Sequence, residues 1–109
     1  MNFEFDANKT ALMIVDMNKA FVGKGAPLEV PKAIDNVPRI KLLLETCRKR
    51  NMPVIHVSHV FRKDGRDRGL MYDFWPVLRN GVLEEGSDGT EIYPDIAPVA
   101  GETVINKHR

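Results

Sequence analysis

The sequence predicts an α/β fold: a doubly wound parallel sheet in a Rossmann-like three-layer arrangement. Residues 11–15, ALMIV, form a continuous apolar run, which is typical of a strand covered on both faces by helices. Residues 34–47 carry apolar side chains at three- and four-residue spacing, which indicates one face of a helix. Residues 53–58, PVIHVS, are rich in β-branched side chains and indicate a second strand. Strand, helix and strand in this order form a βαβ unit.

The limits of the helix can also be predicted from the sequence. Asn36 is a suitable N-cap, which would place Pro38 in the first turn, where a proline is tolerated. The basic residues 48–50 suit the negative end of the helix dipole. Cys47 lies on the apolar face, about 16 Å along the helix from Asn36 at 1.5 Å per residue. We therefore expect Cys47 to be a small core residue rather than a nucleophile.

The second half of the chain is less regular. Residues 59–102 lack a clear period and are heavy in glycine and charge, so we expect short helical turns over one rim of the sheet. Residues 102–107, ETVINK, indicate a third strand. Three strands and one long helix would leave a sheet face and an edge uncovered. We therefore expect residues 1–109 to be the N-terminal part of one larger domain, doubly wound but incomplete. A homo-oligomer, a second chain or a further segment would complete it.

Composition narrows the classes of partner and location. A formal charge of +1 gives no electrostatic case for binding nucleic acid or an anionic membrane. A single cysteine excludes an internal disulfide framework, and the N-terminus lacks the apolar core of a secretory signal. The longest apolar run is far shorter than the ~20 residues that span a bilayer. We expect a cytoplasmic protein.

The side chains that could take part in catalysis lie where the predicted strands end. Ligands of open α/β sheets bind outside the carboxyl ends of the strands. Asp16 follows the first strand, Ser58 and His59 end the second, and Lys107 ends the third. An acid and an amine in one crevice can tune each other's pKa and share proton transfer. On spacing alone, a plain solvated salt bridge between Asp16 and Lys107 is slightly favoured over that catalytic pair.

Three stretches together resemble the isochorismatase-like cysteine hydrolases. They are ALMIVDMNKAF at 11–21, KLLLETCRKRNMPVIHVSHVFR at 41–62 and EEGSDGTEIYPDIAPVAGETVINKHR at 84–109. This superfamily includes nicotinamidases, N-carbamoylsarcosine amidases, ureidoacrylate amidohydrolases and isochorismatases. The specific signal is the order of the motifs, with an aspartate closing the first strand and a G-x-E-I-x-P run before a strand that ends in lysine.

The resemblance implies a Cys-Asp-Lys triad and the hydrolysis of a C–N bond in a small amide, carbamoyl or ureido substrate. By motif position, Asp16 would be the general base for the thiol, and Lys107 the cation that favours the thiolate. Phe21 would be a wall of the pocket. We also expect His59 and Trp75 at the pocket as substrate-binding residues, although packing on the sheet rim or on a subunit partner is favoured over substrate contact for Trp75, and the two can coexist.

The sequence departs from the family pattern at two places. The segment G-[VI]-x-[TS]-x-x-C-V that carries the family nucleophile is absent, so we expect no activity from the 109 residues alone. The motif D-x-Q-x-D-F is replaced here, with Asn18 and Ala20 in place of the glutamine and the second acid. Two alternatives therefore stay open: an isochorismatase-type vinyl ether hydrolase without the cysteine, and a non-catalytic module or pseudoenzyme.

No metal or other cofactor is predicted. The Asp-x-His pattern of nicotinamidases fails here because Val54 stands in the aspartate position. His56 and His59 are three residues apart, so on a strand their side chains would point to opposite faces and would not converge on one ion.

Overall fold

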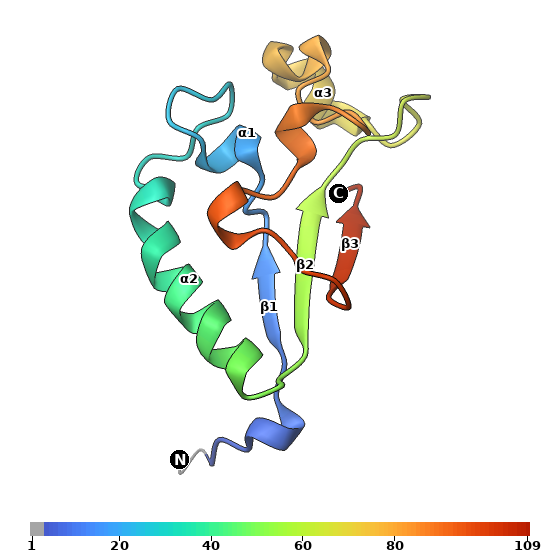
Figure 1. Ribbon diagram of the computed structural model, residues 1–109. Helices are drawn as coiled ribbons and strands as arrows, with labels where there is room; N and C mark the ends of the chain where they lie inside the picture. Colours follow the sequence, from blue (N-terminus) through green and yellow to red (C-terminus); the bar gives the residue numbers. More distant parts are fainter. Residues whose placement is uncertain (1–3) are drawn as a thin grey trace.

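The computed structural model describes residues 4–109 and contains one three-stranded parallel sheet (Figure 1). The strands are β1 Leu12–Val15, β2 Val54–His59 and β3 Thr103–Lys107, in the order β1-β2-β3. Helix α2, Ala33–Lys49, connects β1 to β2 and runs beside them. The predicted α/β class is confirmed, and each predicted strand lies within one residue of its observed limits.

Helix α2 begins earlier than the sequence predicts, and the N-cap prediction is wrong. The N-cap is Lys32 in a left-handed conformation (φ 64°), and Asn36 lies inside the first turns. A turn from Val30 to Ala33 starts the helix, because the Ala33 N–H donates to the Val30 carbonyl at 3.0 Å. Pro38 is consequently an interior residue, and its ring removes the hydrogen bond to the carbonyl of Ile34. Pro38 is exposed, so water can reach that region of the helix.

The main core lies between α2 and one face of the sheet. Helix α2 buries Val37, Leu44 and Cys47, and the sheet contributes Ile14 and Val54. Burying such side chains contributes roughly 25 cal/mol per Å² of apolar surface, which makes this contact the main anchor of the fold. The prediction that Cys47 is a core residue is confirmed, because only 5% of it is exposed.

The opposite face of the sheet is largely uncovered. The strand register places Met13 beside Ile55, and Val15 beside Val57 and then Ile105. Met13, Val15 and Ile105 are 56%, 48% and 46% exposed. The prediction that three strands and one long helix leave a sheet face uncovered is therefore confirmed within residues 4–109, and the cover on both faces that the apolar run 11–15 indicates is not present in this part of the chain. Both outer strands, β1 and β3, also have a free edge in this part of the chain.

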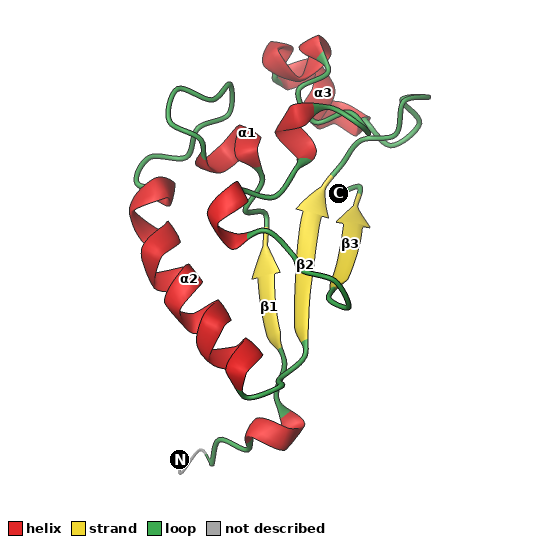
Figure 2. Ribbon diagram, in the orientation of Figure 1, coloured by secondary structure: helices red, strands yellow, loops and turns green. Residues whose placement is uncertain are grey.

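Short helices gather around the carboxyl end of the sheet (Figure 2). They are α1 Lys19–Val22, α3 Gly69–Phe74, and the 3-10 helices η2 Pro76–Asn80 and η3 Asp88–Thr90. Helix η4, Pro94–Ile96, instead packs against α2, and η1, Ala7–Lys9, precedes β1. These turns confirm the prediction for residues 59–102. No helix among residues 4–109 combines the length and the apolar character that crossing a membrane requires.

Candidate active site

Asp16 and Lys107 form an ion pair over the carboxyl end of the sheet. The Asp16 Oδ2 atom lies 3.0 Å from the Lys107 Nζ atom, and each side chain is about one-third exposed. Asp16 has a left-handed backbone (φ 57°), which aspartate adopts more readily than most residues. Its N–H still donates to the Val57 carbonyl at 2.8 Å, so the chain turns immediately after the last bond of the ladder. That turn directs the carboxylate over β2 toward the end of β3.

One cavity of about 290 Å³ brings together all five residues that the sequence singles out. Asp16, Phe21, His59, Trp75 and Lys107 line it. Its other walls are mostly apolar: Leu28, Met71, Leu78 and Leu83, with Arg109 at one side. A small cavity with apolar walls and a few convergent polar groups is the usual form of a small-molecule site. The roles of the five residues remain predictions.

The second oxygen of Asp16 is free to act on an occupant of this cavity. The Oδ1 atom is buried and has no hydrogen-bond partner within residues 4–109, whereas Oδ2 contacts Lys107. A buried acceptor left without a partner is destabilising by about 1–3 kcal/mol. The arrangement can therefore accept a proton or a hydrogen bond from a group that enters the cavity.

His59 lies at the end of β2 and is 7% exposed. Its ring meets Phe61 edge to face, with 4.9 Å between the ring centroids. Burial lowers the pKa of His59, and the ammonium of Lys107 lowers it further. The imidazole is therefore neutral at pH 7. Its Nε2 atom is buried without a hydrogen-bond partner in the described chain.

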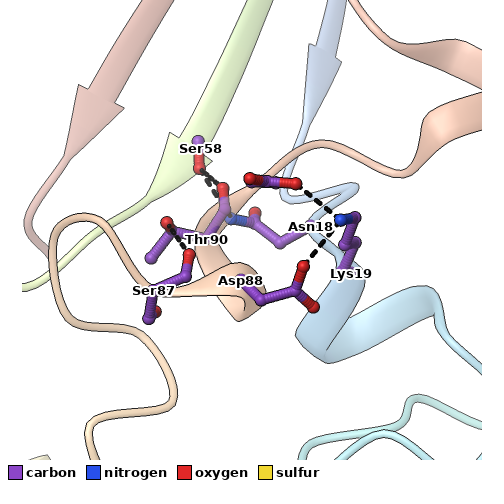
Figure 3. A network of polar contacts seen from close by, with 7 residues as sticks. Asn18, Lys19, Ser58, Ser87, Asp88 and Thr90 are labelled. Carbon is purple, nitrogen blue, oxygen red and sulfur yellow. Dashed lines mark hydrogen bonds and ion pairs between the residues drawn. The ribbon is translucent and has the colours of Figure 1, made fainter.

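Asn18 connects the ends of two strands to a distant loop (Figure 3). Its Nδ2 atom donates to Ser58 Oγ at 2.6 Å and to the Thr90 carbonyl at 2.8 Å. Ser58 Oγ also donates to the Thr90 carbonyl, at 2.8 Å. The sequence identifies Asn18 only as a departure from the family motif and does not predict its role at the site. Asn18 follows the strand-end Asp16 by two residues, and this position indicates that it lies at the rim of the site.

Lys19 adds an ion-pair cluster beside this network. Its Nζ atom lies 2.7 Å from Asp88 Oδ1 and 2.5 Å from Glu91 Oε2. The hydrogen bond to Asp88, followed by the one to Glu91, raises the pKa of Lys19. The Lys19 N–H also donates to the Glu91 carbonyl at 2.8 Å. The segment after η3 is thus fixed beside the start of α1.

A second buried carboxylate holds the loop that follows β2. Asp67 is 5% exposed and accepts the Arg62 N–H at 3.1 Å. Its Oδ2 atom lies 3.2 Å from Nδ1 of His108, which also contacts the Val60 carbonyl at 2.6 Å. Burial alone would raise the pKa of Asp67, but the Arg62 N–H and nearby charges lower it below its ordinary value. Asp67 therefore ties this loop to the residue that follows Lys107.

His56 has entirely different surroundings from His59, as the strand geometry predicts. Its Nε2 atom lies 3.0 Å from Glu102, whose oxygens also accept from Arg48 at 2.6 and 3.0 Å. The hydrogen bonds from Arg48 are the main cause that lowers the pKa of Glu102 to about 2. Among residues 4–109, no three His, Cys, Asp or Glu side chains converge as metal ligands would.

A family model described as the isochorismatase domain matches residues 10–109. The chain belongs to the isochorismatase family. This family member is 30% identical over 107 residues to N-carbamoylsarcosine amidase of Arthrobacter sp, across 94% of the chain and 39% of that relative. It is also 30% identical over 105 residues to isochorismatase of Bacillus subtilis, across 95% of the chain and 32% of that relative.

A solved structure gives the same result for the fold. A cysteine hydrolase from Pseudomonas syringae pv. phaseolicola matches with a TM-score of 0.88 at 29% identity, across 97% of this chain and 49% of that one. The isochorismatase-family chain thus spans between about a third and a half of the length of these three proteins.

Proposed function

We propose that the chain is the N-terminal part of a cysteine hydrolase that cleaves a C–N bond of a small amide, carbamoyl or ureido compound. The observation that carries this proposal is the Asp16–Lys107 pair, with 3.0 Å between Oδ2 and Nζ. Asp16 lines the cavity and its Oδ1 atom is unpartnered among residues 4–109, so the carboxylate keeps an acceptor for a proton, as a general base requires. The amidase among the relatives, whose name states its activity, supports the same reaction class.

In this mechanism, Asp16 accepts the proton of a cysteine thiol through Oδ1, and the Lys107 ammonium stabilises the thiolate. The thiolate attacks the carbonyl carbon of the substrate and forms a C–S bond. The C–N bond then breaks, and the proton on Asp16 passes to the departing amine. Water, deprotonated by Asp16, attacks the thioester, releases the carboxylic acid and restores the thiol.

The thiol must come from outside these 109 residues. Cys47 is the only cysteine, and it is buried on α2, near the end that leads into the start of β2. Asp16 lies at the other end of the sheet, after β1. The uncovered face around Met13 and Val15, and the greater length of the relatives, support a further segment that covers the sheet. We propose that this segment, in the same chain, a second copy or another chain, supplies the cysteine.

The test uses the protein that contains this chain together with its completing segment. Ammonia release from a panel of small amides should fall by at least about 100-fold in Asp16→Asn, which removes the base. Asp35→Asn, an exposed position on α2, is the matched control and should remain active. Near-normal turnover by Asp16→Asn would remove Asp16 from the mechanism. Turnover by the pure 109-residue chain would contradict the proposal that the thiol lies elsewhere.

A second candidate is a vinyl ether hydrolase of the isochorismatase type, which needs no cysteine. The Bacillus subtilis isochorismatase among the relatives favours it, as does the lack of a thiol beside Asp16 in this chain. Iodoacetamide separates the two: alkylation should stop a cysteine-dependent amidase and leave a vinyl ether hydrolase active. A completed protein that turns over neither substrate class would be a non-catalytic module, in which Asp16 and Lys107 form a structural salt bridge.

A further inference from the structure

A residue that lines the cavity beside Asp16 and Lys107 carries a second unsatisfied polar atom. His59 is 7% exposed, and its Nε2 atom has no hydrogen-bond partner anywhere in residues 4–109. His59 lines the same cavity as Asp16 and Lys107. Buried polar groups in folded proteins are almost always hydrogen-bonded, so an unpartnered one at a cavity wall points to an occupant.

Surrounding contacts fix the position of this histidine. The ring packs edge to face on Phe61, which is itself buried. Asn18 contacts the His59 backbone on both sides: its Oδ1 atom accepts the His59 N–H at 3.4 Å, and its Nδ2 atom approaches the His59 carbonyl at 3.5 Å. Asn18 is fully buried and is held by Ser58 and Thr90. The imidazole is thus placed before any ligand arrives, which reduces the entropy lost on binding.

The chemistry of the three polar groups indicates what can occupy the cavity. Asp16 Oδ1 is an acceptor, and the Lys107 ammonium is a donor. A neutral imidazole carries one N–H and one lone pair, so His59 can form a hydrogen bond without introducing a further charge. A carboxamide has both a carbonyl acceptor and N–H donors and therefore matches this set. The volume of about 290 Å³ holds about ten water-sized groups, which suits an amide with a short apolar chain.

We propose that His59 is a substrate-binding residue whose Nε2 atom hydrogen-bonds the carboxamide of a small amide, with the aliphatic part against the apolar walls of the cavity. The choice of an amide as occupant rests on the proposed function. The assignment of His59 rests on its burial, its unpartnered nitrogen and its place in the cavity.

The protein that contains this chain together with its completing segment offers a direct binding test, with butyramide as the probe and Asp16→Asn as the background that prevents turnover. Trp75 is the only tryptophan of these 109 residues and borders the cavity, so its fluorescence should change and saturate as butyramide binds. In the protein labelled with ¹⁵N-histidine, the His59 Nε2 resonance should shift with the same dissociation constant. His56 is the internal control, because it also has a buried ring nitrogen without a partner in the described residues but borders no part of this cavity.

Two variants separate hydrogen bonding from packing. His59→Phe keeps an aromatic ring against Phe61 but loses the hydrogen bond, so the dissociation constant should rise about tenfold. His59→Gln keeps a donor and an acceptor and should bind within about threefold of the unaltered chain. If His59→Phe does not fold, the His59→Gln titration and the ¹⁵N shifts still decide the question.

The proposal is overturned if Trp75 reports binding while the His59 resonance stays fixed, or if His59→Phe binds as tightly as the unaltered chain. It is equally overturned if butyramide produces no saturable signal up to its solubility limit. Failure of the proposed function has a different result: butyramide would bind through His59, but the completed protein would hydrolyse no amide. If the completed protein hydrolyses an amide and His59→Phe leaves KM unchanged, the proposed function is supported and the assignment of His59 to substrate binding is wrong.

Discussion

Protonation of Glu102 should remove a substantial part of the stability that links α2 to β3. The carboxylate accepts two hydrogen bonds from Arg48, at 2.6 and 3.0 Å, and the Val99 N–H at 3.2 Å. His56 contacts it at 3.0 Å, and the Glu102 side chain is only 9% exposed. These contacts stabilise the charged form and lower the pKa of Glu102 from 4.5 to about 2, with Arg48 as the main cause.

The size of the effect follows from this pKa difference. A pKa lowered from 4.5 to about 2 corresponds to on the order of 3 kcal/mol of unfolding free energy at pH 7, because each tenfold change in proton affinity is worth about 1.36 kcal/mol. Because the pKa of Glu102 is lower in the folded protein, the contribution is complete above about pH 5. It is lost as the pH falls from about 4.5 toward 2, and about 2 kcal/mol should be gone by pH 3.

Urea unfolding followed by circular dichroism at pH 7, 5, 4 and 3 measures this contribution. Glu102→Gln should be less stable than the unaltered chain at pH 7. The difference in unfolding free energy between the two proteins should decrease steadily below pH 5. Glu45→Gln removes an exposed carboxylate from α2, the helix that carries Arg48, and should follow the unaltered chain closely at every pH. A gap between Glu102→Gln and the unaltered chain that stays constant from pH 7 to 3 would refute the link to the Glu102 charge.

Three substitutions and one labelling experiment test the packing. Gly89→Ala would place its Cβ 2.1 Å from the Val82 carbonyl oxygen, so urea unfolding should show a loss of at least about 2 kcal/mol. Gly25→Ala meets no atom within 4 Å and adds only the strain of an alanine at φ 75°, so it should lose less, and equal losses would argue against the clash. Asn18→Ala should lower the unfolding free energy by about 1–3 kcal/mol, because buried polar partners lose their bonds; an unchanged melting temperature would contradict this. Native Cys47 should resist a thiol reagent that labels it rapidly in urea, and fast native labelling would disprove its burial.

Much of the fold was predictable because local sequence and long-range packing agree. The apolar run before Asp16 and the β-branched run before His59 have local strand patterns, and both are strands in the sheet. The start of α2 was not predictable from the preferences of Asn36 and Pro38, because the turn at Val30–Ala33 decides it. The exposure of Met13 agrees with the uncovered sheet face that three strands and one long helix predict, although the apolar run alone does not show which face is uncovered.

The candidate site likewise has features that the sequence predicts and features that only the three-dimensional structure shows. The strand-end rule places Asp16 and Lys107 at one edge of the sheet, and their approach needs only the order of the strands. The network of Asn18 depends on the Thr90 carbonyl, 72 residues away in sequence, which no local pattern encodes. The unpartnered Nε2 of His59 could likewise be recognised only once its three-dimensional surroundings were known.

The left-handed backbone at Asp16 has a consequence for how this position can vary. At φ 57°, most side chains clash with their own backbone, while asparagine and glycine do not or do so less. The shape of the turn therefore filters which residues can replace the acid without strain. Homologous proteins that have lost the chemistry but kept the turn should carry asparagine or glycine here. A β-branched residue at this position would indicate that the strand end itself has been rebuilt.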